Sequence, residues 1–201
     1  REGERVIIAG VPWRVGTIYM FTQLTNPAMP GASLRLPLQT LAAMTSRPSK
    51  LGEAWFPCEI GSWILVNGST LAQVTDITPE HVVISYQGGL KRWIPMATFI
   101  TMDTASLSGG FSRSITLDYH VSDESMKAVD VVKYLKTAIR ECLLRSIRSE
   151  ELRDLKVELQ NSQGATHVYE VTALFTAALA PQYQSLQALL QHAAAEASNR
   201  L

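Results

Sequence analysis

The sequence has little cysteine, no net charge and no long hydrophobic run. Cys58 and Cys142 are its only cysteines, too few for a disulfide framework, so a reducing compartment is the simpler expectation. Lysine plus arginine equals aspartate plus glutamate, 18 against 18, which argues against a dedicated nucleic-acid binder. No segment approaches the roughly 18 to 20 consecutive apolar residues of a membrane helix. These absences predict a water-soluble polypeptide.

Signals for targeting are also missing from the start of the chain. No basic segment followed by an apolar core marks a signal peptide. The chain begins at Arg1 instead of a methionine, directly on a β-rich segment. We therefore expect further sequence upstream in the whole protein, while 46% apolar residues are enough to build a sizeable core.

Residues suited to catalysis or metal binding are scattered along the chain. No cysteine and histidine stand at zinc-site spacing, and the four histidines are far apart: His81, His120, His167 and His192. Gly88-Gly89 and Gly109-Gly110 lack the Lys-Ser/Thr of a phosphate-binding loop, so both pairs are predicted to form turns. The sequence predicts no enzyme, no catalytic residue, no metal site and no cofactor.

What the sequence does contain is a repeated octet. Gly3–Gly10 reads GERVIIAG and Gly61–Gly68 reads GSWILVNG, so each has two β-branched residues, Val6 and Ile8 or Ile64 and Val66, on one face of a strand between terminal glycines. Glycine at either end of a short β-branched run is typical of a strand bounded by tight bends. Self-similarity at one offset predicts a duplicated module.

The offset of 58 continues beyond the octets. It carries Gly31 onto Gly89 and Pro37 onto Pro95, within an apolar-Pro-apolar-x-Thr-apolar pattern that is predicted to close each copy. Between them the register slips by one residue, as an insertion in a loop would cause. The alternative is two unrelated β segments with similar turns. The residues predicted to form the structural turns of the repeat are Gly3, Gly10, Gly31, Pro37, Gly61, Gly68, Gly89 and Pro95.

Three domains follow from these patterns. Residues 1–48 are predicted to form a first small β-barrel of four or five strands, and residues 49–107 a second, joined through the polar stretch Ser46–Gly52. In the second copy, strands are predicted at 63–66, 71–77, 81–86 and 90–94, with a hairpin at Gly88-Gly89. We expect Trp13, Trp55, Trp63 and Trp93 to anchor the barrel cores or module interfaces, because tryptophan dominates burial where small units meet.

Residues 108–201 change period and predict an α+β domain. Alternation at 115–121 indicates a strand, and helical spacing from Val131 to Leu143 indicates a helix. Strands at 155–159 and 167–176, with a turn at Gln163-Gly164, and a last helix at 182–200 complete the order β, α, β, β, α. This is most of a ferredoxin-like sandwich. Helix caps are predicted at Ser122, Asp123 and Ser125.

The second module and the last domain together resemble the small-conductance mechanosensitive channel (MscS-like) family. The resemblance is carried by Gly61–Gly68, Val74, Ile77, Gly88-Gly89 and Ile94-Pro95, and by the segment from Leu159 to Val171. It covers residues 59–201 directly and the first copy through the repeat. Met96 and Leu38 stand where the family has an asparagine after the proline, so its polar contact is absent here.

The resemblance implies two tandem Sm-like or SH3-like β-barrels followed by a ferredoxin-like α/β sandwich. It implies the cytoplasmic region of a mechanosensitive channel-like protein of the bacterial inner membrane, with the β layer beneath the membrane and the last domain in the vestibule wall. The implied partners are further copies of the chain, a heptamer in that family, and the membrane through an upstream segment. The alternatives are a non-channel interaction scaffold and, disfavoured by neutrality, an RNA-binding protein.

Overall fold

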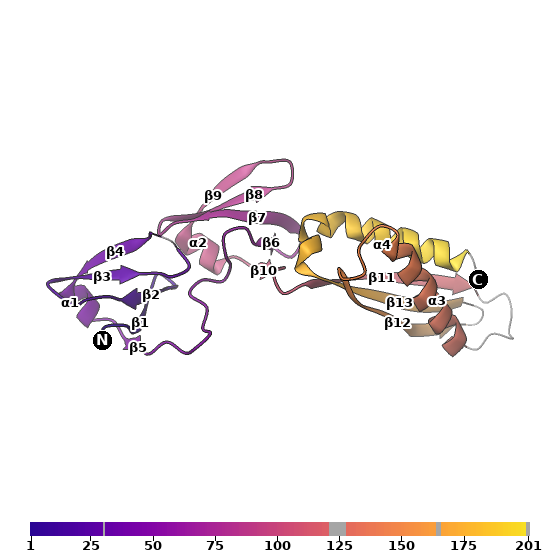
Figure 1. Cartoon of the computed structure of the whole chain (residues 1–201), viewed down its shortest axis with the longest axis horizontal. Coiled ribbons are helices and arrows are strands. Elements are labelled where there is room, and N and C mark those ends of the chain that lie inside the picture. The colour runs from indigo at the N-terminus through magenta and orange to yellow at the C-terminus, as the bar shows by residue number, and fades with distance from the viewer. Residues whose placement is uncertain (30, 121–127, 164–165, 200–201) are drawn as a thin grey trace. The chain divides into compact units, whose positions relative to one another are not determined.

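The computed structural model describes residues 1–29, 31–120, 128–163 and 166–199. The chain divides into two compact units, Arg1–Ser106 and Leu107–Leu201. The first unit holds two five-stranded antiparallel sheets, and the second holds a three-stranded antiparallel sheet and two long helices (Figure 1). The chain is therefore mostly β-sheet with some helix, as the sequence predicted.

The first sheet has the strand order β4-β3-β2-β1-β5. Val6, Trp13 and Leu24 turn inward from three neighbouring strands and are buried, because side chains of one strand alternate between the two faces of a sheet. Its elements are β1 (Arg5–Ile8), β2 (Val11–Val15), β3 (Phe21–Thr25), β4 (Ser33–Pro37), α1 (Leu38–Ala42) and β5 (Ser46–Arg47).

The second sheet repeats this arrangement in the order β10-β6-β7-β8-β9. Read from β9 to β10, it corresponds strand for strand to the first sheet, with a short helix before the last strand in both. Its elements are β6 (Trp63–Val66), β7 (Thr70–Ile77), β8 (His81–Tyr86), β9 (Lys91–Pro95), α2 (Met96–Thr101) and β10 (Thr104–Ser106). Sequence patterns missed α1, α2, β5 and β10, which are all short.

The prediction that the apolar-Pro pattern closes each copy is wrong, because a further strand follows it in both copies. Pro37 and Pro95 end β4 and β9 and begin α1 and α2, after which β5 and β10 return to pair with β1 and β6. Proline has no N–H for a sheet ladder, and its fixed φ suits the start of a helix. The pattern therefore marks a strand-to-helix junction inside each copy.

The register slip has a structural cause in the first hairpin. Ile8 pairs with Val11 across the two-residue turn Ala9-Gly10, whereas Val66 pairs with Thr70 across three residues. The extra residue raises the offset from 58 to 59. It reaches 60 in the next strand, since Phe21 and His81 are the residues that pair with Pro37 and Pro95. The connection from β8 to β9 is shorter than the one from β3 to β4, which restores the offset of 58. The register slip is therefore two residues and not one.

The joint between the sheets begins later in the chain than predicted. Ser46 and Arg47 belong to β5, which pairs with Val6 and Arg5 of β1. The joint therefore begins after Arg47 and continues to β6. Phe56 and Cys58 in this joint are buried in the same apolar cluster as inward-facing residues of both sheets, so in the first unit the two sheets share one core.

The second unit has the sheet order β11-β13-β12. Both outer strands are antiparallel to β13, so β11 and β12 run in the same direction with β13 between them. Its elements are β11 (Phe111–His120), α3 (Ala128–Leu144), β12 (Leu152–Gln163), β13 (Thr166–Phe175), the 3-10 helix η1 (Ala177–Gln182) and α4 (Tyr183–Ser198).

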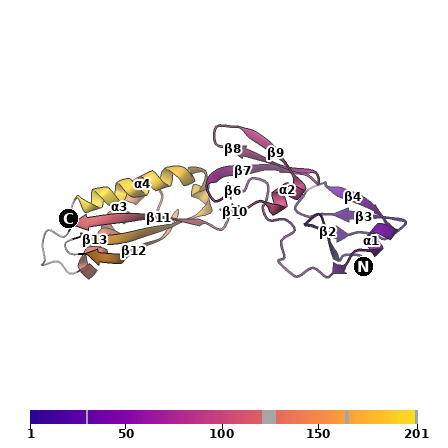
Figure 2. The same ribbon diagram turned by 180° about the vertical axis from the view of Figure 1, so that it is seen from behind.

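Helices α3 and α4 lie on one face of this sheet, as Figures 1 and 2 show from opposite sides. Their buried stripes, which include Leu135 and Leu190, pack with Tyr169, Val171 and Phe175 of β13 in one apolar cluster. The order β, α, β, β, α is the one predicted. The caps predicted at Ser122, Asp123 and Ser125, and Gly164 of the predicted turn, lie outside the described residues.

Candidate functional site

The glycines of the repeat adopt backbone conformations that other residues rarely take. All six have positive φ, at 80° and 90° for Gly3 and Gly61, 82° and 71° for Gly10 and Gly68, and 77° and 86° for Gly31 and Gly89. A Cβ atom is unfavourable in this region, and glycine avoids that cost. The six positions thus occur as three matched pairs.

Backbone hydrogen bonds reproduce the same pairs. The N–H of Gly3 donates to the carbonyl of Val15 at 2.7 Å, and the N–H of Gly61 donates to that of Val74 at 2.7 Å. In return, Val15 donates to Glu4 at 2.8 Å and Val74 to Ser62 at 2.9 Å. In each sheet the entry to the first strand is therefore hydrogen-bonded to the second strand in the same way.

The two prolines occupy equivalent helix starts. Pro37 has φ −56° and ψ 142°, and Pro95 has φ −51° and ψ 138°. The residue after each proline donates its N–H across the sheet, from Leu38 to Met20 at 3.0 Å and from Met96 to Glu80 at 2.9 Å. These bonds hold the start of α1 and α2 against the turn that precedes β3 and β8.

The turn at Gly10 contacts the neighbouring module. A Cβ added to Gly10 would lie 2.8 Å from Cγ2 of Ile100 in α2, whereas one added to Gly68 would meet nothing within 4 Å. The first hairpin of the first sheet is thus pressed against the helix of the second. Glycine at this position serves both the turn and the contact between modules.

An ion-pair cluster ties the joint to the first sheet. Arg47 Nη1 donates to Glu53 Oε2 at 2.9 Å, and its Nη2 donates to Oε1. The backbone N–H of Lys50 adds a third bond to Glu53 at 3.1 Å, and Arg5 Nη1 lies 3.4 Å from Oε1. Bidentate pairing of a guanidinium and a carboxylate fixes geometry as well as charge. The cluster therefore holds the start of the joint in place.

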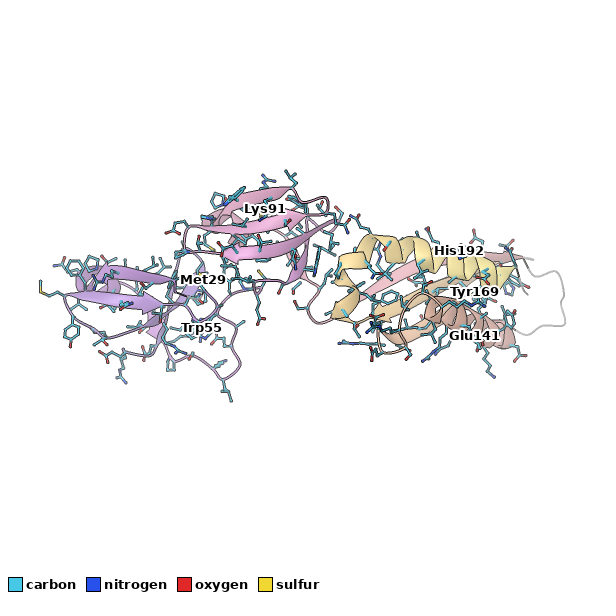
Figure 3. All side chains as sticks on the ribbon, turned by 45° about the horizontal axis from the view of Figure 1, so that its top comes forward. Met29, Trp55, Lys91, Glu141, Tyr169 and His192 are labelled. Carbon is cyan, nitrogen blue, oxygen red and sulfur yellow. The ribbon has the colours of Figure 1, made fainter. Side chains whose placement is uncertain are left out.

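Trp55 stacks on Arg5 of this cluster and on Arg14. The guanidinium carbons of Arg5 and Arg14, which are opposite each other on β1 and β2, lie 4.9 Å and 5.2 Å from its ring centre. Figure 3 shows Trp55 beside the strands of the first sheet. Arg5 is buried, and its Nε and Nη1 have no hydrogen-bond partner. Stacking and the nearby Glu53 carboxylate compensate its charge instead.

Asn26 completes the attachment, in a role that the sequence did not reveal. Its side chain is 3% exposed, and Nδ2 donates to the carbonyls of Pro12 at 2.9 Å and Trp55 at 3.0 Å. Its Oδ1 accepts from the N–H of Ala28 at 2.7 Å. The sequence gives Asn26-Pro27 only as a turn signal, because the bond to Trp55 spans 29 residues.

Acid should loosen this attachment. Hydrogen bonds from Arg47 and Lys50, followed by the charges of Arg47 and Arg5, lower the pKa of Glu53 from its ordinary 4.5 to about 2. A lowered folded-state pKa gives stability that is complete above about pH 4.5 and lost as the pH falls toward 2. We expect Glu53→Gln to remove the loss of stability between about pH 4.5 and 2 that comes from Glu53. Tryptophan fluorescence during unfolding at each pH measures this.

The matched control for this prediction is Glu59→Gln, at an exposed glutamate nearby. Unfolding midpoints of the Glu59 variant should follow those of the unchanged chain throughout the range from pH 4.5 to 2. If the Glu53 variant follows the unchanged chain as well, the ion-pair cluster does not stabilise the folded first unit.

The tryptophans divide into buried and exposed positions. Trp13 is buried in the core of the first sheet, and Trp55 stacks on arginines as described. The expectation that all four anchor a barrel core or a module interface is wrong for Trp93, which is 62% exposed on the edge strand β9 beside exposed Leu90. Its side chain points to the outer face, because the neighbouring Ile94 takes the inward position.

The remaining candidate groups of the described residues have ordinary structural environments. Burial raises the pKa of the Cys58 thiol to about 12, which keeps it protonated and poorly nucleophilic. His81 contacts Thr78, and His167 Nδ1 lies 3.4 Å from the hydroxyl of Tyr169. Among the described residues, no three His, Cys, Asp or Glu side chains gather where a metal ion could bind. In the same residues, no helix has the length and hydropathy to span a membrane.

Comparison with solved structures finds channels that resemble the chain. The chain is similar in structure to MscS-like channels, the family that the sequence pattern indicated. No protein-family model matches the chain, and no curated protein matches it in sequence.

Two channels illustrate the similarity. Wild-type MSL1 of Arabidopsis thaliana is 16% identical at a TM-score of 0.45, over 68% of this chain and 47% of that one. MscS of Helicobacter pylori in its closed state is 10% identical at a TM-score of 0.48, over 72% of this chain and 54% of that one. The chain spans about half of the length of the channels that it matches.

Proposed function

We propose that the chain is the cytoplasmic region of a mechanosensitive channel-like membrane protein and has no enzymatic activity. Its two β modules, residues 1–48 and 49–107, would form the layer beneath a bacterial inner membrane, and residues 108–201 the vestibule wall. The observation that carries the proposal is the order of parts. A five-stranded sheet whose fourth strand ends at Ile94-Pro95 is followed at once by the β11–α3–β12 unit.

The details of each part support the finer assignment. Matched positive-φ glycines, matched hydrogen bonds and equal strand orders favour two copies of one Sm-like module. In the second unit, β11 and β12 run in the same direction with β13 between them, and this order favours the split βαβ of a ferredoxin-like domain. The turn residues of the repeat would then be structural, since they shape the modules without touching a ligand.

Self-association is part of the proposal. The strands β9 and β10 lie at the edges of the second sheet, and an edge strand presents backbone groups that another chain can pair with. Trp93 and Leu90 add large exposed apolar surface to one of these edges, and exposed aromatic residues are enriched at protein interfaces. A ring of identical subunits would cover such edges by closed symmetry.

The test is the mass and conductance of the full-length protein. In detergent, light scattering should give a homo-oligomer, and reconstituted protein should show currents that open under membrane tension. Trp93→Ser should lower the oligomer's stability, whereas Leu159→Ser, at an exposed apolar site of the second unit, should not. A monomeric full-length protein would overturn the proposal, and an oligomer without tension-gated current would favour the interaction scaffold.

A further inference from the structure

The overall neutrality of the chain conceals a separation of charge between the two sheets. Residues 61–106, which hold the second sheet, contain the two basic residues Lys91 and Arg92 against the three acidic residues Asp76, Glu80 and Asp103. Residues 1–52 contain six basic residues, Arg1, Arg5, Arg14, Arg35, Arg47 and Lys50, against the two acidic residues Glu2 and Glu4. The first sheet is therefore cationic, and the argument from net charge does not apply to it alone.

One end of the cationic sheet exposes a cluster of apolar side chains. Tyr19, Met20 and Phe21, where β3 begins, are 72%, 82% and 60% exposed. Leu38 at the start of α1 is also exposed and donates its N–H to Met20. In the part of the chain that the structure describes, no other three consecutive large apolar residues are exposed. We call these four residues the apolar tip; Figure 1 shows β3 and α1.

The second sheet shows that the fold does not require an apolar tip. Phe21 and His81 occupy the same place, since each pairs with the proline that ends the next strand. The residues equivalent to Tyr19, Met20 and Phe21 are therefore Pro79, Glu80 and His81, and the residue equivalent to Leu38 is Met96, which is only 5% exposed. At this position, apolar exposure is found in the first copy and not in the second, so its cause is not the folding of the module.

The charges around the tip suit an anionic surface. No acidic residue occurs between Gly16 and Gly52. Arg35 lines a surface cavity of about 420 Å³ together with Tyr19 and Phe21, which places a guanidinium beside the aromatic residues. Glu2 is the acidic group at the base of the tip, and its carboxylate already accepts the N–H of Ile18 at 2.8 Å.

From this arrangement we propose that the apolar tip inserts into the headgroup region of an anionic lipid bilayer. Aromatic residues favour the membrane interface, and shallow insertion is strengthened by basic residues that face anionic lipids. A stable protein interface buries roughly 800 Å² on each partner, which a four-residue tip does not supply. Nucleic acid would need several basic side chains among the aromatics, whereas Arg35 is the one basic residue in the lining of the cavity that Tyr19 and Phe21 share.

This inference deepens the proposed function and rests on it for the source of the bilayer, since it names the β module that meets the membrane. The physical binding can nevertheless be measured on the 201-residue chain itself. Sedimentation with vesicles of equimolar phosphatidylcholine and phosphatidylglycerol should recover the chain, and recovery should fall as salt is raised. Vesicles of phosphatidylcholine alone should recover much less.

The decisive variant replaces Tyr19, Met20 and Phe21 with serine. Because the three side chains are exposed, folding should be retained, and recovery with anionic vesicles should fall about tenfold or more. The control is the double replacement Ile60→Ser and Leu159→Ser, which removes exposed apolar side chains outside the first sheet and should leave recovery unchanged. If the triple variant does not fold, Met20→Ser, at the most exposed of the three, is measured instead.

Several results would overturn the inference. These are no recovery of the unchanged chain with anionic vesicles, equal recovery of the tip variant, loss of self-association by the tip variant without lipid, or loss of RNA retention with unchanged vesicle binding. Failure of the channel proposal looks different. A full-length protein that carries no current, while the chain still binds vesicles through the tip, would overturn the channel and leave the membrane contact standing.

Discussion

Replacing Gly110 with alanine is expected to destabilise the second unit by about 3 kcal/mol or more. Gly110 has φ 95°, and a Cβ there would lie 2.6 Å from the backbone oxygen of Phe175 and 3.1 Å from Nη1 of Arg153. A backbone oxygen of the central strand β13 cannot move aside cheaply. Arg153 would also have to release the carbonyl of Gly109, to which it donates at 2.8 Å.

Its neighbour provides the control. A Cβ on Gly109 would meet nothing within 4 Å, and Gly109 does not have positive φ, so Gly109→Ala should change the free energy of unfolding by about 0.5 kcal/mol at most. Urea unfolding followed by far-ultraviolet circular dichroism measures both variants, since the long helices α3 and α4 lie in this unit. Equal midpoints for the two variants would contradict the close approach to β13.

Replacing Asn26 with alanine should destabilise the first unit by about 3 kcal/mol. The variant loses three hydrogen bonds and leaves the carbonyls of Pro12 and Trp55 and the N–H of Ala28 to find new partners. Asn26→Asp should be at least as harmful, because a carboxylate would face two carbonyl oxygens in a buried site. All four tryptophans lie in the first unit, so their fluorescence reports its unfolding.

Asn161→Ala is the matched control for this prediction. Asn161 is exposed, and its Oδ1 accepts only from the adjacent N–H of Ser162 in the described contacts. Its loss should leave the tryptophan transition where it was. A tryptophan midpoint for Asn26→Ala that equals the one for Asn161→Ala would show that the bond to Trp55 does not hold the joint.

Much of the fold was predictable because its causes are local. Alternation of apolar residues indicated β6, β8 and β13, and helical spacing indicated α3 and α4. Short elements were missed, since α1 and α2 have no full amphipathic period and β5 has only two residues. Trp93 was misjudged because a strand pattern does not say whether a face of an edge strand meets a core or solvent.

The features of the candidate site were predictable only in part from the sequence. The repeat could be read from glycine and proline spacing, because positive φ and strand termination are properties of single residues. The difference between Tyr19-Met20-Phe21 and Pro79-Glu80-His81 could not be read from the sequence. The two segments are aligned by a repeat offset of 60 residues, which is known only from the strand pairing. The net charge of the whole chain likewise does not show that the first sheet is cationic, because the charges of its two parts cancel.

The sequence by itself determined the class of fold, the order of the strands and helices, and the backbone geometry of the turns, since each follows from neighbouring residues. Tertiary structure decided which groups meet. Three contacts join residues that are far apart in the chain: the Arg5–Glu53 pair, the Asn26 bond to Trp55 and the contact of Gly10 with Ile100. The apolar tip was recognised only by comparing equivalent positions of the two sheets. Such contacts depend on how sheets pack, and packing is a property of the folded whole.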